Sequence, residues 1–97
     1  MQEFGQPQIT YDQGIVSYTF NEDWQQEDIA QLASTILGKL DGFNQLEHIA
    51  GADREDFRLK QGDIVFKLSF DMYSQSIWLE GEDQAAREYL ATLFNKG

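Results

Sequence analysis

The most constraining feature of this sequence is an alternation of apolar and polar residues that runs from Asp56 to Glu80. The alternation is broken at Gln61-Gly62 and again around Tyr73-Ser74. A period of two is typical of a strand with one buried face, and short polar breaks between such runs are typical of hairpin turns. Because connections this short cannot carry a parallel crossover, the segment predicts three consecutive antiparallel strands.

Counting outward from each break predicts the register of these strands. With Gln61-Gly62 as a two-residue turn, in which the glycine accepts a positive φ, two apolar pairs and two oppositely charged pairs form. These pairs are Leu59 with Ile64, Phe57 with Phe66, Lys60 with Asp63 and Asp56 with Lys67. The second break fits a four-residue loop, Met72 to Gln75. Its pairs are Phe70 with Ile77, Leu68 with Leu79, Ser69 with Trp78 and Lys67 with Glu80.

Two segments show the spacing of amphipathic helices. From Trp24 to Leu40 apolar residues recur with the period of a helix, and Asp23 is a candidate N-cap with Gln26 at the spacing of a capping box. Gly42 is expected to end this helix. A second helix is expected between Gly81 and Phe94, with two acids near its positive end.

The remaining segments complete a small two-layer fold. Gln8 to Phe20 contains the turn signal Asp12-Gln13-Gly14 and is expected to be a strand or a small hairpin. Phe43 to Ala50 alternates weakly, which leaves open whether it is a strand. We expect a single α+β domain over residues 1–97. Its antiparallel sheet should hold about four to five strands, in the order β-α-β-β-β-α with both helices on one face.

Composition narrows the functional classes. Seventeen acids against seven bases give a net charge of −10, so neither direct nucleic-acid binding nor membrane binding is expected. The charge favours solubility or attraction to a basic partner. The absence of cysteine excludes disulfides and thiolate chemistry. Because there is no apolar run of about 20 residues and no secretory signal in MQEFGQPQ, we expect a cytoplasmic protein. The small size and general style of the chain lead us to expect a bacterial one.

The stretch FKLSFDMYSQSIWLEGED, from Phe66 to Asp83, resembles short uncharacterised proteins of gamma-proteobacteria that consist of one small α+β domain. The resemblance covers roughly the last third of the chain and includes no catalytic motif. It implies a bacterial cytoplasmic domain of unknown function, and it carries over no functional residues.

No pattern of catalytic or ligand-binding residues is found. His48 is the only histidine, and a triad of His48 with Ser69, Ser74 or Ser76 would lack a nucleophile elbow. The acidic stretch DREDFRLKQGDI fails as a calcium loop, because its fifth, sixth and twelfth positions hold the wrong residues. No glycine motif for phosphate binding occurs. We therefore expect no cofactor, no metal site and no catalytic activity.

One group of residues has no evident structural role and lies on the sheet face that the helices would leave open. Its members are Arg58, Lys60, Val65, Lys67, Ser69 and Trp78. Trp78 and Arg58 are the strongest candidates for a binding site, because Trp and Arg are enriched at interface hot spots. The alternative is structural: Trp78 packs over the aliphatic stem of Lys67 and against the first strand.

These observations favour a non-catalytic protein-binding or regulatory module that uses the open sheet face, with a symmetric homodimer as one form of that binding. One alternative is an acidic inhibitor or immunity-type protein, which would neutralise a basic partner through a patch around Glu22, Glu27 and Asp28. Another is a small hydrolase, which would require a pocket around His48.

Overall fold

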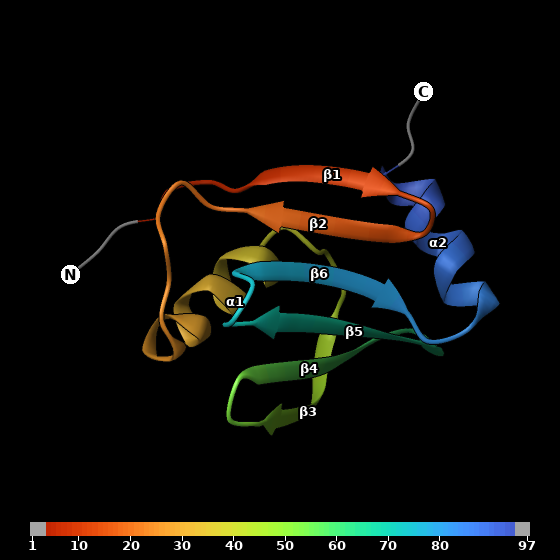
Figure 1. The fold of residues 1–97 in the computed structure, drawn as a ribbon. Coiled ribbons are helices and arrows are strands. Elements are labelled where there is room, and N and C mark those ends of the chain that lie inside the picture. The colour runs from red at the N-terminus through yellow and green to blue at the C-terminus, as the bar shows by residue number, and fades with distance from the viewer. Residues whose placement is uncertain (1–3, 95–97) are drawn as a thin grey trace.

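The computed structural model describes residues 4–94, which form a six-stranded antiparallel sheet with two α-helices on one face (Figure 1). The strands in this part of the chain are β1 (Gln8–Asp12), β2 (Ile15–Thr19), β3 (Asn44–Ala50), β4 (Arg54–Gln61), β5 (Ile64–Asp71) and β6 (Ser76–Gly81). The helical elements are the short 3-10 helix η1 (Gln26–Asp28), α1 (Ile29–Leu37) and α2 (Gln84–Phe94). The strand order is β1-β2-β6-β5-β4-β3, so β1 and β3 are the edges.

The expected strand number and element order are wrong, although the chain is α+β. Six strands replace the four to five expected, and the order is β-β-α-β-β-β-β-α. Gln8 to Phe20 contains a complete hairpin, because Gln13 and Gly14 both take a positive φ, 50° and 85°, which suits a two-residue turn between twisted strands. Asn44–Ala50 is a full strand whose residues are all exposed, which explains its weak alternation.

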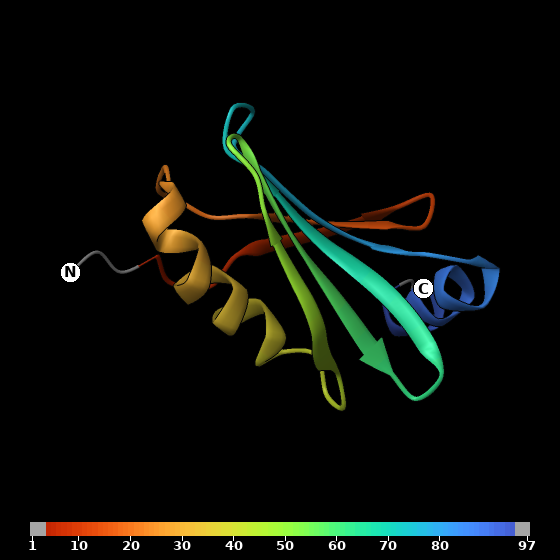
Figure 2. The same ribbon diagram turned by 90° about the horizontal axis from the view of Figure 1, so that it is seen from below.

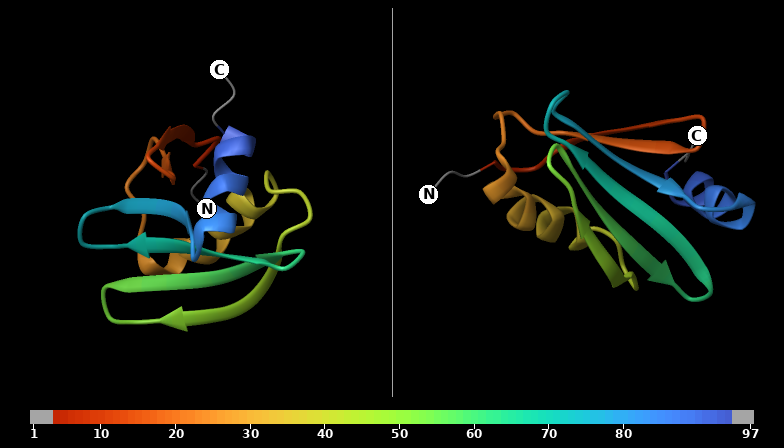
Figure 3. Two further views of the ribbon diagram at one scale, coloured as in Figure 1. Left: turned by 90° about the vertical axis from the view of Figure 1, so that its right-hand side faces the viewer. Right: turned by 60° about the horizontal axis from the view of Figure 1, so that its bottom comes forward.

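Both helices lie behind the sheet in Figure 1 and below it in Figure 2, and Figure 3 shows them at opposite ends of the strands. The helix residues in the core include Ile29, Leu32, Ile36, Ala86 and Leu90. The strand residues that join them are Val16, Tyr18, Phe57, Leu59, Phe66, Leu68, Phe70, Ile77 and Leu79. The alternation from Asp56 to Glu80 therefore predicted the two faces of the sheet correctly. Within residues 4–94, neither helix is both long and apolar enough to cross a bilayer.

One of the two predicted registers is confirmed and the other is wrong. Across the loop from Met72 to Gln75, the pairs Phe70–Ile77, Leu68–Leu79, Ser69–Trp78 and Lys67–Glu80 form as predicted. In the β4–β5 hairpin, however, the loop is Gly62-Asp63, so Lys67 stands opposite Arg58 instead of Asp56. Gly62 has a φ of 64° and is followed by a residue without a positive φ, as in a type II′ turn, which takes glycine first.

The helical segment begins later than predicted. Asp23 is not its cap; instead the side chain of Asp28 accepts a hydrogen bond of 2.8 Å from the N–H of Gln25, as part of a capping box. The buried Trp24 precedes it, and the side-chain amide of Gln75 binds both the N–H and the C=O of Trp24, each at 2.9 Å. The β5–β6 loop thus holds the entry to α1 through residues that are 51 positions apart in the chain.

Candidate binding surface

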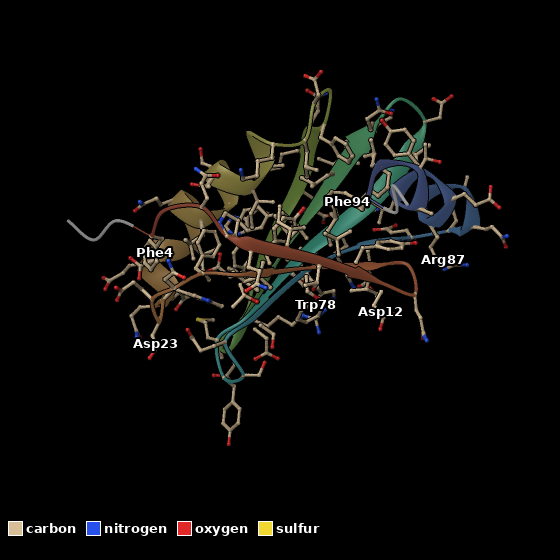
Figure 4. All side chains as sticks on the ribbon, turned by 90° about the horizontal axis from the view of Figure 1, so that it is seen from above. Phe4, Asp12, Asp23, Trp78, Arg87 and Phe94 are labelled. Carbon is tan, nitrogen blue, oxygen red and sulfur yellow. The ribbon has the colours of Figure 1, made fainter. Side chains whose placement is uncertain are left out.

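The six residues singled out from the sequence lie on the open face of the sheet, but in three separate rows across the strands. The rows pair Trp78 with Ser69, Arg58 with Lys67, and Lys60 with Val65. Figure 4 shows Trp78 on the side of the sheet away from α2 and Phe94. The fold therefore places all six on one face without gathering them into one site.

Trp78 lies at the centre of this face and is covered by an arginine that the sequence analysis did not single out. The guanidinium of Arg54 lies 5.1 Å from the centroid of the indole ring. The same guanidinium donates hydrogen bonds to Asp56 Oδ1 at 3.0 Å and to Ser69 Oγ at 3.3 Å. Trp78 remains partly exposed, whereas Ser69 is fully buried beneath these contacts. Arg54 therefore packs against Trp78, and Ser69 is not available to a partner.

Arg58, the second main candidate, is occupied by two acids. Its Nε and Nη2 atoms donate to both carboxylate oxygens of Glu82, at 2.8 and 3.1 Å, and its Nη1 atom donates to Glu47 at 3.2 Å. These hydrogen bonds from Arg58 lower the pKa of Glu82 below its ordinary value. In the same row, Lys67 lies 3.6 Å from Glu80. The basic groups in this row are therefore paired, which makes Arg58 a weaker candidate than Trp78.

The other half of the open face, over β2 and β6, is hollowed, and its lining is uncharged except for Asp71. A depression of about 430 Å³ lies beside Trp78. Its lining includes a set of uncharged side chains that we call the Trp78 surface: Ile15, Ser17, Thr19, Ser76 and Trp78. Ser17 stands directly opposite Trp78, and the side chain of Ile15 is 41% exposed. An exposed apolar group, three hydroxyls and an indole here surround a space large enough for a partner's side chain.

A second cleft, of about 520 Å³, opens on the other face of the sheet between α1 and the strands β3 and β4. His48 lines it, and its Nε2 atom lies 2.7 Å from Oε2 of Glu55, which is only 6% exposed. The side-chain amide of Gln26 donates to Oε1 of Glu55 at 3.0 Å. The imidazole ring stacks on Phe57 with a centroid separation of 4.4 Å. His48 is thus held in one orientation at the mouth of this cleft.

The pocket required by the hydrolase alternative therefore exists, but the serines considered for it are elsewhere. Ser69 and Ser76 lie on the open-face side of the sheet, Ser69 fully buried there, and the hydroxyl of Ser74 donates to that of Ser76 at 2.9 Å. Ser34 lines the cleft, yet among the described residues it forms no side-chain hydrogen bond with His48. A triad of His48 with these serines, which the sequence already disfavoured, is not assembled. Likewise, residues 4–94 contain no group of three or more His, Cys, Asp and Glu side chains placed to hold a metal.

The acids considered for a basic partner lie near the start of α1. Glu27 and Asp28 belong to η1, and the side chain of Asp28 already accepts the hydrogen bond from Gln25. A capping carboxylate retains its charge but is fixed in orientation. The described geometry therefore gives Asp28 a structural explanation.

Comparison with known proteins identifies a family but no characterised relative. A family model described as "Protein of unknown function (DUF3630)" matches residues 6–95. No curated protein and no solved structure matches the chain.

Proposed function

The chain belongs to the DUF3630 family of proteins of unknown function, and we propose that it is a non-catalytic binding module that holds a partner protein on the Trp78 surface. The observation that carries the proposal is the depression of about 430 Å³ beside a partly exposed tryptophan, in which Asp71 is the one charged residue of the lining. The cores of protein interfaces are poor in charge and rich in aromatic residues, and they are surrounded by a polar rim.

The charged half of the open face suits the role of that rim. Its ion pairs, Arg58 with Glu82 and Lys67 with Glu80, are partly exposed and already satisfied, so a partner could dock beside them without leaving a buried charge unpaired. Arg54 is the second residue of the proposal. Its side chain is 44% exposed and its guanidinium covers the indole, so it can stack on a partner group or be displaced by one.

We would test the proposal by affinity purification with a tagged chain from a bacterial host that carries its gene, in line with the bacterial and cytoplasmic setting expected from the sequence. Two variants alter the Trp78 surface: Trp78→Ala removes the indole, and Thr19→Lys places a charge in the depression. Both should lose a partner that the unaltered chain retains. Truncating an interface hot spot costs 2 kcal/mol or more, equivalent to about a thirtyfold loss of affinity.

The matched control is Tyr73→Ala, because Tyr73 is an aromatic residue that is 91% exposed on the β5–β6 loop, outside the Trp78 surface. Circular dichroism would confirm that each variant is folded. Retention of every partner by Trp78→Ala and Thr19→Lys would refute the proposal. If the unaltered chain sediments as a dimer that Thr19→Lys dissociates, the bound partner is a second copy of the chain.

The acidic-inhibitor alternative rests on the net charge of −10 and gives a different result in the same experiment. Its partner would be basic, would stay bound to Trp78→Ala, and would be released by roughly 0.5 M NaCl, at which charge interactions are screened within a few ångströms.

A further inference from the structure

The second surface worth considering is the edge strand β3, which lies far from Trp78 in the strand order. Within residues 4–94, β3 pairs with β4 alone, and its outer backbone edge meets no other strand. Edge strands are usually protected by charges, proline or bulges, because their free N–H and C=O groups can pair with another chain. β3 carries one carboxylate, Glu47, and no proline, while Leu46 and Ile49 are 50% and 47% exposed.

The irregularity in β3 is confined to one end of the strand. Its register against β4 shifts between Gln45 and Glu47, which sets Leu46 apart as a bulge. From Glu47 to Ala50 the pairing with β4 is regular. A regular strand directs the N–H and C=O of every second residue outward along its free edge, so this half of β3 can accept an added strand.

The cleft of about 520 Å³ runs alongside this edge. Small and apolar residues of α1 form one wall, with Ala30, Ala33 and Leu37, while Gln45 and His48 of β3 form the other. The segment Ile29–Leu37 contains no charged residue, so α1 offers an uncharged surface to anything that enters. In a strand added to β3, alternate side chains would point into this cleft, as in peptide recognition by strand addition next to a helix.

Charge indicates which kind of segment fits. The chain has a net charge of −10, the carboxylate of Glu55 forms part of the cleft wall, and Glu47 lies on the edge itself. A carboxylate has about four acceptor positions, so Glu55 can accept a further N–H beside those of its partners Gln26 and His48. A second copy fits poorly, because it would bring another net charge of −10 against Glu47 and Glu55.

We propose that β3 and the adjoining cleft bind an extended, basic peptide segment of a partner protein. The segment adds a strand to the sheet along Glu47–Ala50, places an apolar side chain between Ala30 and Leu37, and directs an arginine or lysine toward Glu55. This binding is independent of the Trp78 surface. It uses the edge strand β3 and the helix-covered face of the sheet, whereas the Trp78 surface lies over β2 and β6 on the open face.

The test uses a synthetic seven-residue peptide whose second, fourth and sixth positions, which share one face of a strand, hold arginine, valine and arginine, with threonine at the other positions. Two controls are the same peptide with both arginines replaced by glutamate and the same peptide with proline at its third position. Proline cannot donate a ladder hydrogen bond. The basic peptide should shift the NMR signals of Glu47–Ala50 and slow amide hydrogen exchange there. Neither control peptide should protect these amides.

Two lysine variants of α1 make the matched comparison. Ala30→Lys places a positive charge in the cleft, whereas Gln31→Lys makes the same addition at the neighbouring exposed residue, which does not line it. Ala30→Lys should weaken the basic peptide about tenfold or more, equivalent to about 1.4 kcal/mol, and Gln31→Lys should change its affinity much less. Trp78→Ala should bind the peptide normally, which separates this proposal from the proposed function.

Several results would overturn the inference. They are no binding of the basic peptide, protection that maps outside β3, equal binding of the acidic peptide, and equal effects of Ala30→Lys and Gln31→Lys. Sedimentation of the peptide-free chain as a dimer that is held through β3 would also overturn it, because the occupant would then be a second copy.

Discussion

Tyr18 places its hydroxyl in the apolar core, where it lowers the stability of the fold. Its side chain is 2% exposed, and within the described residues its hydroxyl has no hydrogen-bond partner. Leaving a buried hydroxyl unsatisfied costs about 1–3 kcal/mol. Tyr18→Phe should therefore raise the free energy of unfolding by about 1 kcal/mol in urea denaturation. Tyr73→Phe is the control and should have no effect, because Tyr73 is 91% exposed.

The same burial of Tyr18 predicts that the fold loses stability at alkaline pH. Desolvation raises the pKa of Tyr18 well above its ordinary value of 10.0, so the folded chain keeps its proton where the unfolded chain loses it. Stability from this group is complete below about pH 10 and falls as the pH rises further, by up to about 1.4 kcal/mol per pH unit. Urea denaturation between pH 9 and 11.5 should show this slope, and Tyr18→Phe should reduce it. An unchanged slope in the variant would assign the loss to other groups.

At the scale of single residues, side-chain alternation predicted which face each residue of the candidate site occupies, but not its contacts. The face on which Trp78 lies follows from the alternation of side chains along β6, and Ile77 and Leu79 are buried on the other face as expected. The partner of Trp78 does not follow, because Arg54 reaches it from a different row of the sheet. The fully buried Ser69 depends on that same arginine, and no local pattern contains this information.

At the scale of elements, turn chemistry decided which registers could be predicted. The β5–β6 loop was predicted correctly, and Asp71 stabilises it by accepting hydrogen bonds from the N–H groups of Tyr73 and Ser74. The β4–β5 loop was misplaced by one residue, because Gly62 can occupy either position of a two-residue turn and the apolar pairs suit both. The sequence thus predicted the faces of the strands more securely than their pairing.

The junction between β6 and α2 depends on the absence of a side chain at Gly81. An added Cβ at Gly81 would lie 2.6 Å from Cβ of Ala86 in the first turn of α2. Gly81→Ala should therefore lower the free energy of unfolding by about 3 kcal/mol, the upper range for overpacking. Gly62→Ala, where the added Cβ meets nothing within 4 Å, should cost only about 1 kcal/mol through its positive φ. Urea denaturation of both variants checks the order, which equal losses would contradict.

The ion pair of Arg58 with Glu82 joins β4 to the turn before α2. It predicts how the stability of the fold changes at acid pH. The hydrogen bonds from Arg58 lower the pKa of Glu82, so this pair stabilises the fold above the ordinary pKa of a glutamate and stops doing so as the pH falls through the lowered value. Glu82→Gln should be less stable than the unaltered chain at pH 7, by a small amount because the pair is partly exposed. The difference should shrink as the pH is lowered from 7 toward 2 and the carboxylate takes up its proton. Thermal unfolding at both pH values tests this, and a difference that persists in acid would indicate lost packing instead.

At the scale of the whole molecule, the order of the strands could not be predicted. The β1–β2 hairpin is apolar on one face, and that face could join the core at either edge of the later three strands. It pairs with β6, where Val16 meets Leu79 and Tyr18 meets Ile77. This choice leaves β3 on the outer edge, and it brings Ser17 beside Trp78. The depression of the Trp78 surface is therefore a product of tertiary pairing.

The net charge of −10 predicts that thermal stability depends on salt, since at least ten of the seventeen acids have no basic residue to neutralise them. Charges repel one another across the whole molecule at low salt, because the Debye length of about 30 Å at 0.01 M is comparable with its extents of 36 × 29 × 22 Å. Near 0.15 M the length falls to about 8 Å and this repulsion is screened. Screening also weakens the exposed ion pairs, but each contributes at most about 1 kcal/mol. The midpoint of thermal unfolding at pH 7 should therefore rise between these NaCl concentrations. Neutralising the exposed carboxylates of Asp12 and Asp63 with asparagine should raise the low-salt midpoint and reduce the salt effect. A midpoint that falls with salt would mean that the ion pairs of the open face outweigh the repulsion.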